Sequence, residues 1–278
     1  MVNEITSKFV QGVDAGPEGL VQLDDTQEGV VVVTLNRPAR KNAFDDELIA
    51  AMSQAFETLR AADGVRVVFL RGAGGAFSAG ADLEWMQRAS GYTEAENRQD
   101  AMVMANMLKA LWDIPALTCA LVEGPAFGGG AGLVAACDLA VATEAARFSF
   151  SEVRLGLIPA VISPYVVAAI GPRAARGLFA TGREISARYA AQIGLITEAV
   201  ANSDELDKAM ERIAEAAVAC APGAVAASKQ LVADIWGRDI DHGLLELTAR
   251  RIAAARVSEE GQEGVRAFLE RRRPSWAG

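Results

Sequence analysis

The chain has 278 residues, of which 51% are apolar and 23% charged, and its formal net charge is −9 at pH 7. This size and composition predict one large globular domain, or one such domain with a smaller appendage. The acidic residues are spread along the chain and the sequence offers no basic face, which argues against nucleic-acid binding.

The N-terminal half alternates between strand-like and helix-like patterns. Residues 1–27 are mixed and are expected to form an N-terminal extension. Runs of β-branched or apolar residues predict strands at 30–36, 65–71, 116–122 and 139–142. Helical periodicity predicts helices at 44–62, 93–111 and 134–136, with a capping box formed by Thr93 and Glu96. This alternation indicates an α/β core over residues 28–200.

The C-terminal part is predicted to be helical. Helices are expected at 174–179, 187–193, 204–219, 222–236, 244–256 and 259–272. Ser186 and Ser258 are candidate N-caps, and Pro222 suits the first turn of its helix. Residues 201–278 are rich in alanine and carry apolar stripes, which suggests an oligomer interface.

Several function classes lose support from single features. The longest apolar stretches span about ten residues, too short to cross a bilayer, and residues 1–14 lack the apolar run of a signal peptide. Cys119, Cys137 and Cys220 lie far apart without metal-ligand spacing, so buried thiols and a reducing cytoplasm are expected. His242 is the only histidine and is expected at the surface or as a cap, which leaves no histidine-rich metal site and no metal is expected.

Two glycine-rich turns, at residues 72–80 and 127–132, each follow a predicted strand. The dinucleotide fingerprint needs glycine at its first, third and sixth positions, but the sixth residue is Phe77 from Gly72 and Leu133 from Gly128. Nucleotide binding of this kind is therefore not predicted. If the two strands are neighbours, the turns can converge and offer two backbone N–H groups to one oxygen, although tight turning alone would also explain the glycines.

The residues around these turns carry a family resemblance. The strings LNRPARKNAF from residue 35, GAFSAGADL from 75, VEGPAFGGG from 122, ACDLAVA from 136 and FSFSEVRL from 148 resemble the enoyl-CoA hydratase/isomerase (crotonase) family. The match runs in order over residues 28–270. The resemblance implies a spiral of ββα units, a C-terminal helical trimerisation region at 201–278, acyl-CoA substrates, and a homotrimer or dimer of trimers. Coenzyme A would enter as part of the substrate, with no separate cofactor.

The resemblance also assigns roles to residues. The N–H groups of Ala79 and Gly129 match the two donors that hold the thioester oxygen of the family's enolate. The matching coenzyme A and pantetheine path is lined by Arg40, Ala43, Ala81, Asp82, Leu83, Phe127, Gly128 and Gly132. Asp82 could equally be an N-cap for a following helix. Trp85 and Met86 are candidates for the acyl chain, Met102, Met104 and Met107 fall in a covering helix, and Arg271–Arg273 are candidates for the phosphates.

The carboxylates depart from the family pattern. Hydratases of this family commonly carry two glutamates, and the position of the first is Gly132 here, whereas the second is kept as Glu152. Glu152 is thus the expected proton-transfer group, with Phe148, Val153, Leu155, Leu157 and Ile158 expected to surround it and raise its pKa. Glu123 is the nearest alternative carboxylate, but it matches no catalytic position.

Three functions remain open, with a dinucleotide-dependent oxidoreductase as a distant fourth. The first is an enoyl-CoA hydratase, nearest in motif to hydratases of branched glutaconyl-CoA compounds such as methylglutaconyl-CoA or isohexenylglutaconyl-CoA, in leucine or terpene breakdown. The second is a Δ3,Δ2-enoyl-CoA isomerase that uses Glu152 as its sole base. The third is a non-catalytic paralogue that binds acyl-CoA.

Overall fold

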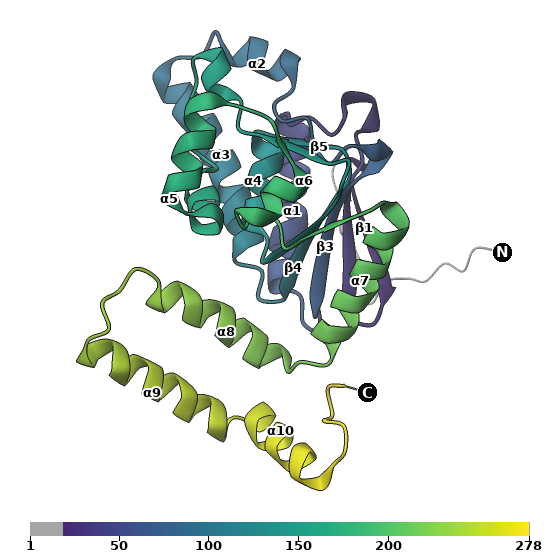
Figure 1. Ribbon diagram of the computed structural model, residues 1–278, viewed down its shortest axis with the longest axis vertical. Helices are drawn as coiled ribbons and strands as arrows, with labels where there is room; N and C mark the ends of the chain where they lie inside the picture. The colour runs from purple at the N-terminus through teal and green to yellow at the C-terminus, as the bar shows by residue number, and fades with distance from the viewer. Residues whose placement is uncertain (1–18, 278) are drawn as a thin grey trace, which may run out of the picture.

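A computed structural model describes residues 19–277, and its centre is a six-stranded sheet (Figure 1). The strand order is β1-β2-β3-β4-β6-β9, and only the β1–β2 pair is antiparallel. The strands span Val21–Gln27 (β1), Val30–Leu35 (β2), Val67–Gly72 (β3), Leu117–Val122 (β4), Leu139–Thr143 (β6) and Glu198–Val200 (β9). All four strands expected from the sequence are therefore confirmed.

Both faces of this sheet are buried, which explains its continuous apolar runs. Along β2, Val31 and Val33 join the main core, whereas Val30 and Val32 join a second cluster on the opposite face. Successive side chains of a strand point to opposite faces, so a strand covered on both sides has no polar alternation. The main core lies under the helices α1 (Asp46–Ala61), α3 (Glu94–Trp112) and α4 (Gly129–Ala136).

A second, three-stranded sheet lies beside the first. It contains β5 (Pro125–Phe127), β7 (Arg147–Ser149) and β8 (Ile185–Ser186) in that order. Chain order alternates between the two sheets, since β4, β5 and α4 follow one another, as do β6, β7 and α5 (Ser163–Thr181). These strand–strand–helix units confirm the expected ββα architecture.

The helices follow their predicted positions, with three differences. The capping box of Thr93 and Glu96 is present, Ser186 and Ser258 are N-caps, and Pro222 lies in the first turn of its helix. The helix α2 (Leu83–Ala89) was expected only as the alternative in which Asp82 is an N-cap. The predicted start of α4 was five residues too late, at Val134 instead of Gly129, and that of α5 was eleven residues too late, at Ala174 instead of Ser163.

Two elements lie across the expected boundaries. Residues 21–27 of the expected N-terminal extension form β1, which pairs with β2, so the core begins before residue 28. Residues 1–18 lie outside the described part of the chain. The helix α7 (Ser203–Val218) belongs to the core rather than to the C-terminal region, because Leu206, Ala209 and Ala217 pack on the second face of the sheet.

The C-terminal region proper begins at Pro222. It contains α8 (Pro222–Ile235), α9 (His242–Val257) and α10 (Glu259–Glu270), and Figure 1 shows these helices extending below the core. Their apolar side chains are largely uncovered: α8 has no buried residue, and Trp236, Ile240, Val257, Phe268 and Leu269 are exposed. Within residues 19–277 no single helix has the length and hydropathy of a membrane span, although α7 and α8 together, at an angle of 101°, pass that test.

Candidate active site

The two glycine-rich turns converge, as expected. Phe127 N–H donates to Ser78 O (2.9 Å) and Ser78 N–H donates to Pro125 O (3.0 Å), which ties the first turn to β5. Gly80 has a φ of +90°, and a Cβ at this position would lie only 3.0 Å from Phe127 O. Only glycine combines this backbone conformation with so close an approach.

The second turn ends in the N-terminus of α4. Gly128 is the N-cap residue with φ +49°, and it offers no side chain to the helix. The N–H groups of Gly129 and Gly130 have no hydrogen-bond partner among the described residues. Free amides at a helix N-terminus carry a partial positive charge and favour a negatively charged oxygen. The Gly129 N–H is thus free to donate, and its role toward a substrate oxygen stays a prediction.

Ala79, the other predicted donor, is already occupied. Its N–H donates to Lys41 O at 2.9 Å. Lys41 and Asn42 both adopt left-handed conformations, with φ values of 51° and 54°. The Asn42 side chain holds this turn in place by donating to Ala73 O and Ala76 O and accepting from Arg37 N. A pair of free donors at residues 79 and 129 is therefore not present, and a ligand oxygen must share or displace the Lys41 carbonyl to reach Ala79.

Glu152 lies beside the start of α4. It begins the 3₁₀ helix η4 (Glu152–Leu155), and a Cβ on Gly128 would lie 3.3 Å from its Oε1. Its Oε2 is buried without a hydrogen-bond partner. Burial raises the pKa of Glu152, and its own backbone amide partly offsets this. A carboxyl with a raised pKa and an unpaired oxygen is suited to proton transfer near neutral pH.

The expected apolar surroundings of Glu152 are only partly present. Phe148 is fully buried, but Val153, Leu155, Leu157 and Ile158 are exposed, with Ile158 at 76%. These four side chains follow Glu152 on η4 and the next loop and point outward. The carboxyl of Glu152 instead lies near Gly128, at the start of α4, where an added Cβ would be 3.3 Å from Oε1.

Gly132, where the family pattern has a glutamate, faces an isoleucine. A Cβ at this position would lie 2.3 Å from Ile162 Cγ2 and 2.9 Å from Ile162 Cβ. Real Cβ atoms do not approach other atoms so closely. The missing carboxylate is thus not a gap in the structure, because Ile162 fills its place.

The residues predicted to line the coenzyme A path divide into buried and exposed groups. Ala43 is buried, Phe127 is half-buried, and Ala81, Leu83 and Arg40 are exposed, with Leu83 at 79%. Arg40 pairs with Glu84 at 2.6 Å, and the hydrogen bond that Arg40 donates to Glu84 raises the pKa of Arg40. An exposed leucine and arginine in adjoining turns suit a ligand with an apolar arm and phosphates.

Asp82 is an N-cap, the alternative given for it above. It is 4% exposed, accepts from Glu84 N and Trp85 N, and forms an ion pair with Arg37 at 2.9 Å. Burial alone would raise the pKa of Asp82, but the two amides and Arg37 outweigh it and lower that pKa. Asp82 therefore fixes the start of α2. Its Oδ1 accepts from the two amides of α2, and its Oδ2 pairs with Arg37.

Two side chains lie close to Gly129: Phe44, which was not assigned to the site from the sequence, and Met104, which was given there only as part of the covering helix. A Cβ on Gly129 would lie 2.7 Å from Phe44 Cε2 and 2.8 Å from Met104 Cε. Met104 comes from the covering helix α3, while Met107 of that helix is buried in the core and Met102 is half-exposed. Trp85 packs against the core, and Met86 is half-buried.

The remaining predicted features have structural roles or differ from expectation. Arg272 pairs with Glu263 and Glu270, and Arg271 ends α10 in a left-handed conformation. The Glu123 carboxylate accepts hydrogen bonds from Arg71 and Ser203 and shares no hydrogen-bond partner with Glu152. Of the free cysteines, Cys119 is buried as expected, Cys137 is half-buried, and Cys220 is exposed because it follows the end of α7. His242 is exposed in the first turn of α9.

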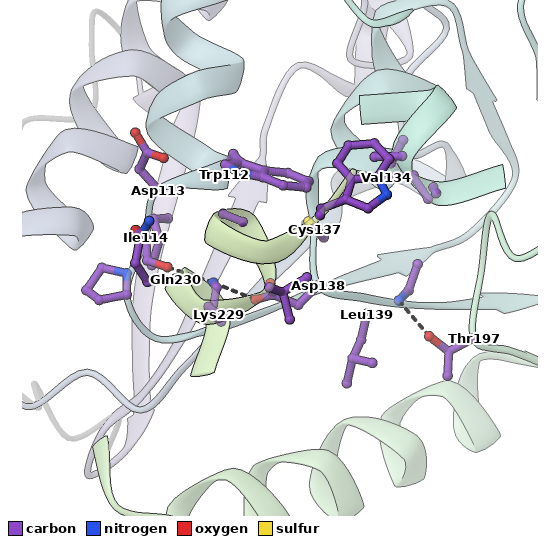
Figure 2. Close-up of a pocket in the computed structure, with 18 of the residues that line it drawn as sticks. Trp112, Asp113, Ile114, Val134, Cys137, Asp138, Leu139, Thr197, Lys229 and Gln230 are labelled. Carbon is purple, nitrogen blue, oxygen red and sulfur yellow. Dashed lines mark hydrogen bonds and ion pairs between the residues drawn. The ribbon is translucent and has the colours of Figure 1, made fainter. Parts of the chain in front are cut away.

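A cavity of about 1080 Å³ lies elsewhere, between the core and α8. Figure 2 shows Lys229 of α8 among the lining residues, directed toward Asp138. The Lys229 ammonium contacts Asp138 (2.6 Å), Ile114 O (2.7 Å) and Ala116 O (2.8 Å), so all three of its hydrogens have acceptors. Lys229 thus anchors α8 to the core. Glu152, Ala79 and Gly129 do not line this cavity. Within residues 19–277 no group of three or more metal-ligating side chains is found.

Comparisons with known proteins agree on one family. The enoyl-CoA hydratase/isomerase family model matches residues 25–278. A Thermus thermophilus protein named "Putative enoyl-CoA hydratase" is 38% identical over 245 residues, covering 88% of this chain and 96% of that protein. A solved "putative enoyl CoA hydratase/isomerase (crotonase)" from Legionella pneumophila is 45% identical with a TM-score of 0.87, covering 92% of this chain and 98% of the other. An enoyl-CoA hydratase from Shewanella pealeana is 39% identical with a TM-score of 0.89, covering 92% and 96%.

Proposed function

Because this chain belongs to the enoyl-CoA hydratase/isomerase family, we propose that it is an enoyl-CoA hydratase that stabilises a thioester enolate on the Gly129 amide and transfers the proton with Glu152. The observation that carries this proposal is the position of the Glu152 carboxyl, next to the unpaired amides that begin α4.

The proposed chemistry follows from where charge develops. Water adds across the C2–C3 double bond, with its oxygen bonding to C3 and a proton arriving at C2. Attack at C3 pushes electrons onto the thioester oxygen, and a preorganised N–H at a helix N-terminus stabilises that charge without rearranging. One such donor is typically worth about 2.7–4 kcal/mol of barrier.

The carboxyl of Glu152 would handle the proton. Its unpaired Oε2 can accept a proton from water and return it to C2, and a pKa raised by burial brings it nearer to the working pH. The second donor would be Ala79, once its N–H turns from Lys41 O toward the thioester oxygen.

A second candidate is an enoyl-CoA isomerase that moves a proton between C4 and C2 of a 3-enoyl-CoA. A specific observation favours it: Ile162 occupies the place of a second carboxylate, so Glu152 is the one acid beside α4 in the described contacts. A single base suffices for this reaction, since it takes the proton from one carbon and returns it to another.

A panel of acyl-CoA thioesters tests the assignment. The purified chain is incubated with straight, branched and carboxylated 2-enoyl-CoA compounds, including glutaconyl types, and with 3-enoyl-CoA compounds. Mass spectrometry scores gain of water, and chromatography scores movement of the double bond. Gain of water supports the hydratase and identifies its acyl group, and a shifted double bond at constant mass supports the isomerase. Binding without turnover on the whole panel would mean a non-catalytic acyl-CoA-binding protein.

We also propose that the chain works as a homotrimer or a dimer of trimers in the cytoplasm. The exposed apolar residues of α8, α9 and α10, among them Trp236 and Phe268, support an assembly that covers them. Light scattering after size-exclusion chromatography should give a mass of three or six chains. A monomer at micromolar concentration would contradict this proposal.

A further inference from the structure

One face of α4 lies against both Glu152 and Ile162. Gly132 N–H donates to Gly128 O at 3.0 Å, so these two glycines lie one helical turn apart on the same side. A Cβ on Gly128 would lie 3.3 Å from Glu152 Oε1, and a Cβ on Gly132 would lie 2.3 Å from Ile162 Cγ2. Glu152 and Ile162 therefore lie against positions of α4 that are one turn apart, and one turn of a helix rises about 5.4 Å.

Ile162 has no freedom to leave this position. It is 2% exposed, belongs to the main core, and is the N-cap residue of α5 without using its side chain as a cap. The adjoining turn is fixed by Ser163 N–H, which donates to Ala160 O, and by Val166 N–H, which donates to Ile162 O. A β-branched side chain also has few allowed rotamers. A Cβ added at residue 132 would lie 2.3 Å from Ile162 Cγ2, and a simple rotation of the Ile162 side chain would not relieve this overlap.

We propose that Ile162 determines the reaction specificity of this site: it fills the position on α4 beside Glu152 from which a second proton-transferring group would act, and so lowers water addition relative to proton transfer in comparison with a site that has two such groups. This inference rests on the proposed function of Glu152. Residue 132 is the position one turn from Gly128 on this face, and Ile162 leaves no room for a side chain there. With apolar methyl groups at this position, Glu152 alone remains beside α4 to activate a water for addition at C3.

The steric part of the inference is tested without any activity. The Gly132→Ala variant should lower Tm by roughly 3–10 °C, because its new methyl group overlaps Ile162. In an Ile162→Ala background the same Gly132→Ala change should cost less than about one third of that shift. Equal Tm losses in both backgrounds would overturn the proposal.

The chemical part uses the double variant Gly132→Glu/Ile162→Ala. Its ratio of hydration to isomerisation, measured with 2-enoyl-CoA and 3-enoyl-CoA of one chain length, should exceed that of wild type at least tenfold. The matched control Gly132→Gln/Ile162→Ala has nearly the same shape without the carboxyl and should stay within threefold of Ile162→Ala alone. Gly132→Glu alone should show no gain, because Ile162 still fills the space.

The outcomes separate the two proposals. If Gly132→Glu alone gains hydration with an unchanged Tm, or if the glutamate and glutamine double variants behave alike, Ile162 does not control the site and this inference fails. If wild type and Glu152→Gln are equally active, the proposed role of Glu152 fails instead, and the inference that rests on it falls too. The Tm coupling between residues 132 and 162 then still reports whether they collide.

Discussion

Replacing Glu152 by glutamine removes the proposed proton-transfer group and little else. Glutamine has almost the same volume, and the Oε2 atom has no hydrogen-bond partner to lose. A positioned acid–base group contributes about 10²–10⁴-fold to rate, which is about 2.7–5.4 kcal/mol of barrier. We therefore expect kcat to fall 10²–10⁴-fold while KM changes less than about threefold, since binding rests on other residues.

The pH dependence adds a second readout. Because burial raises the pKa of Glu152 above its ordinary value of 4.5, kcat/KM of the wild type should rise with pH through that raised value. The same shift affects stability. The folded state holds this proton more tightly than the unfolded state, so the contribution of Glu152 to stability is greatest below pH 4.5 and declines as pH rises through the folded-state pKa. Glu152→Gln should remove that decline and should not lower Tm at pH 7.

Stopped-flow absorbance of the enoyl thioester between pH 5 and pH 9 measures the rates, and thermal unfolding over the same range measures stability. Glu123→Gln is the matched control, because Glu123 is a half-buried glutamate held by Arg71 and Ser203. It should keep kcat within about twofold. Activity of Glu152→Gln within tenfold of wild type, on the best substrate of the panel, would refute the reasoning.

Three further substitutions test the parts around Glu152. Gly129→Ala should lower both kcat and Tm, because its methyl group would overlap Phe44 and Met104. The control Gly177→Ala lies in the exposed part of α5 with open space around it, and it should leave Tm unchanged or raise stability by up to about 1 kcal/mol. Equal effects of the two substitutions would contradict the packing around Gly129. Asp82→Ala should lower the free energy of unfolding in urea at pH 7 by about 1–2 kcal/mol, because the α2 N-cap is lost. The difference from wild type should shrink as pH falls through the lowered pKa of Asp82. A difference that grows toward acid pH would contradict this role. Arg40→Ala should weaken coenzyme A binding several-fold, measured by calorimetry, without changing Tm. The control Arg60→Ala breaks a similar exposed ion pair with Glu57 and should leave binding unchanged. Identical affinities in both variants would show that Arg40 is not part of the site.

Much of the core could be predicted because its physical causes are local or repetitive. The strands of the main sheet are buried on both faces, so their continuous β-branched runs are visible in the sequence. Caps at Thr93, Ser186 and Ser258 could be predicted for a similar reason, since a cap depends on residues within one turn. The strands β5, β7 and β8 have two or three residues each, too few to show any periodicity.

The start of α4 was missed because its sequence opposes it. Residues 129, 130 and 132 are glycines, the poorest helix formers apart from proline. The glycines are required by contacts from distant segments instead: Phe44 and Met104 against Gly129, Ser78 against Gly130, and Ile162 against Gly132. Such contacts join residues far apart in the chain, so the local pattern carries no trace of them.

The site itself was predicted in part. Glu152 and Gly129 lie at the same end of α4, as the family resemblance implied. The bond from Ala79 to the Lys41 carbonyl could not be foreseen, because it depends on two consecutive non-glycine residues in left-handed conformations. The left-handed region is uncommon for residues other than glycine, and although asparagine is enriched there, Lys41 gives no local sign of it.

The central claim is that the α4 N-terminus polarises a bound thioester while residue 152 moves the proton. The infrared frequency of a ¹³C-labelled thioester carbonyl, in 2-enoyl-CoA bound to the Glu152→Gln variant, measures that polarisation directly, because the missing acid stalls turnover. We expect a clear shift to lower wavenumber relative to the free thioester, and a smaller shift when Gly129→Ala is added. A bound carbonyl that absorbs at the free frequency would contradict it.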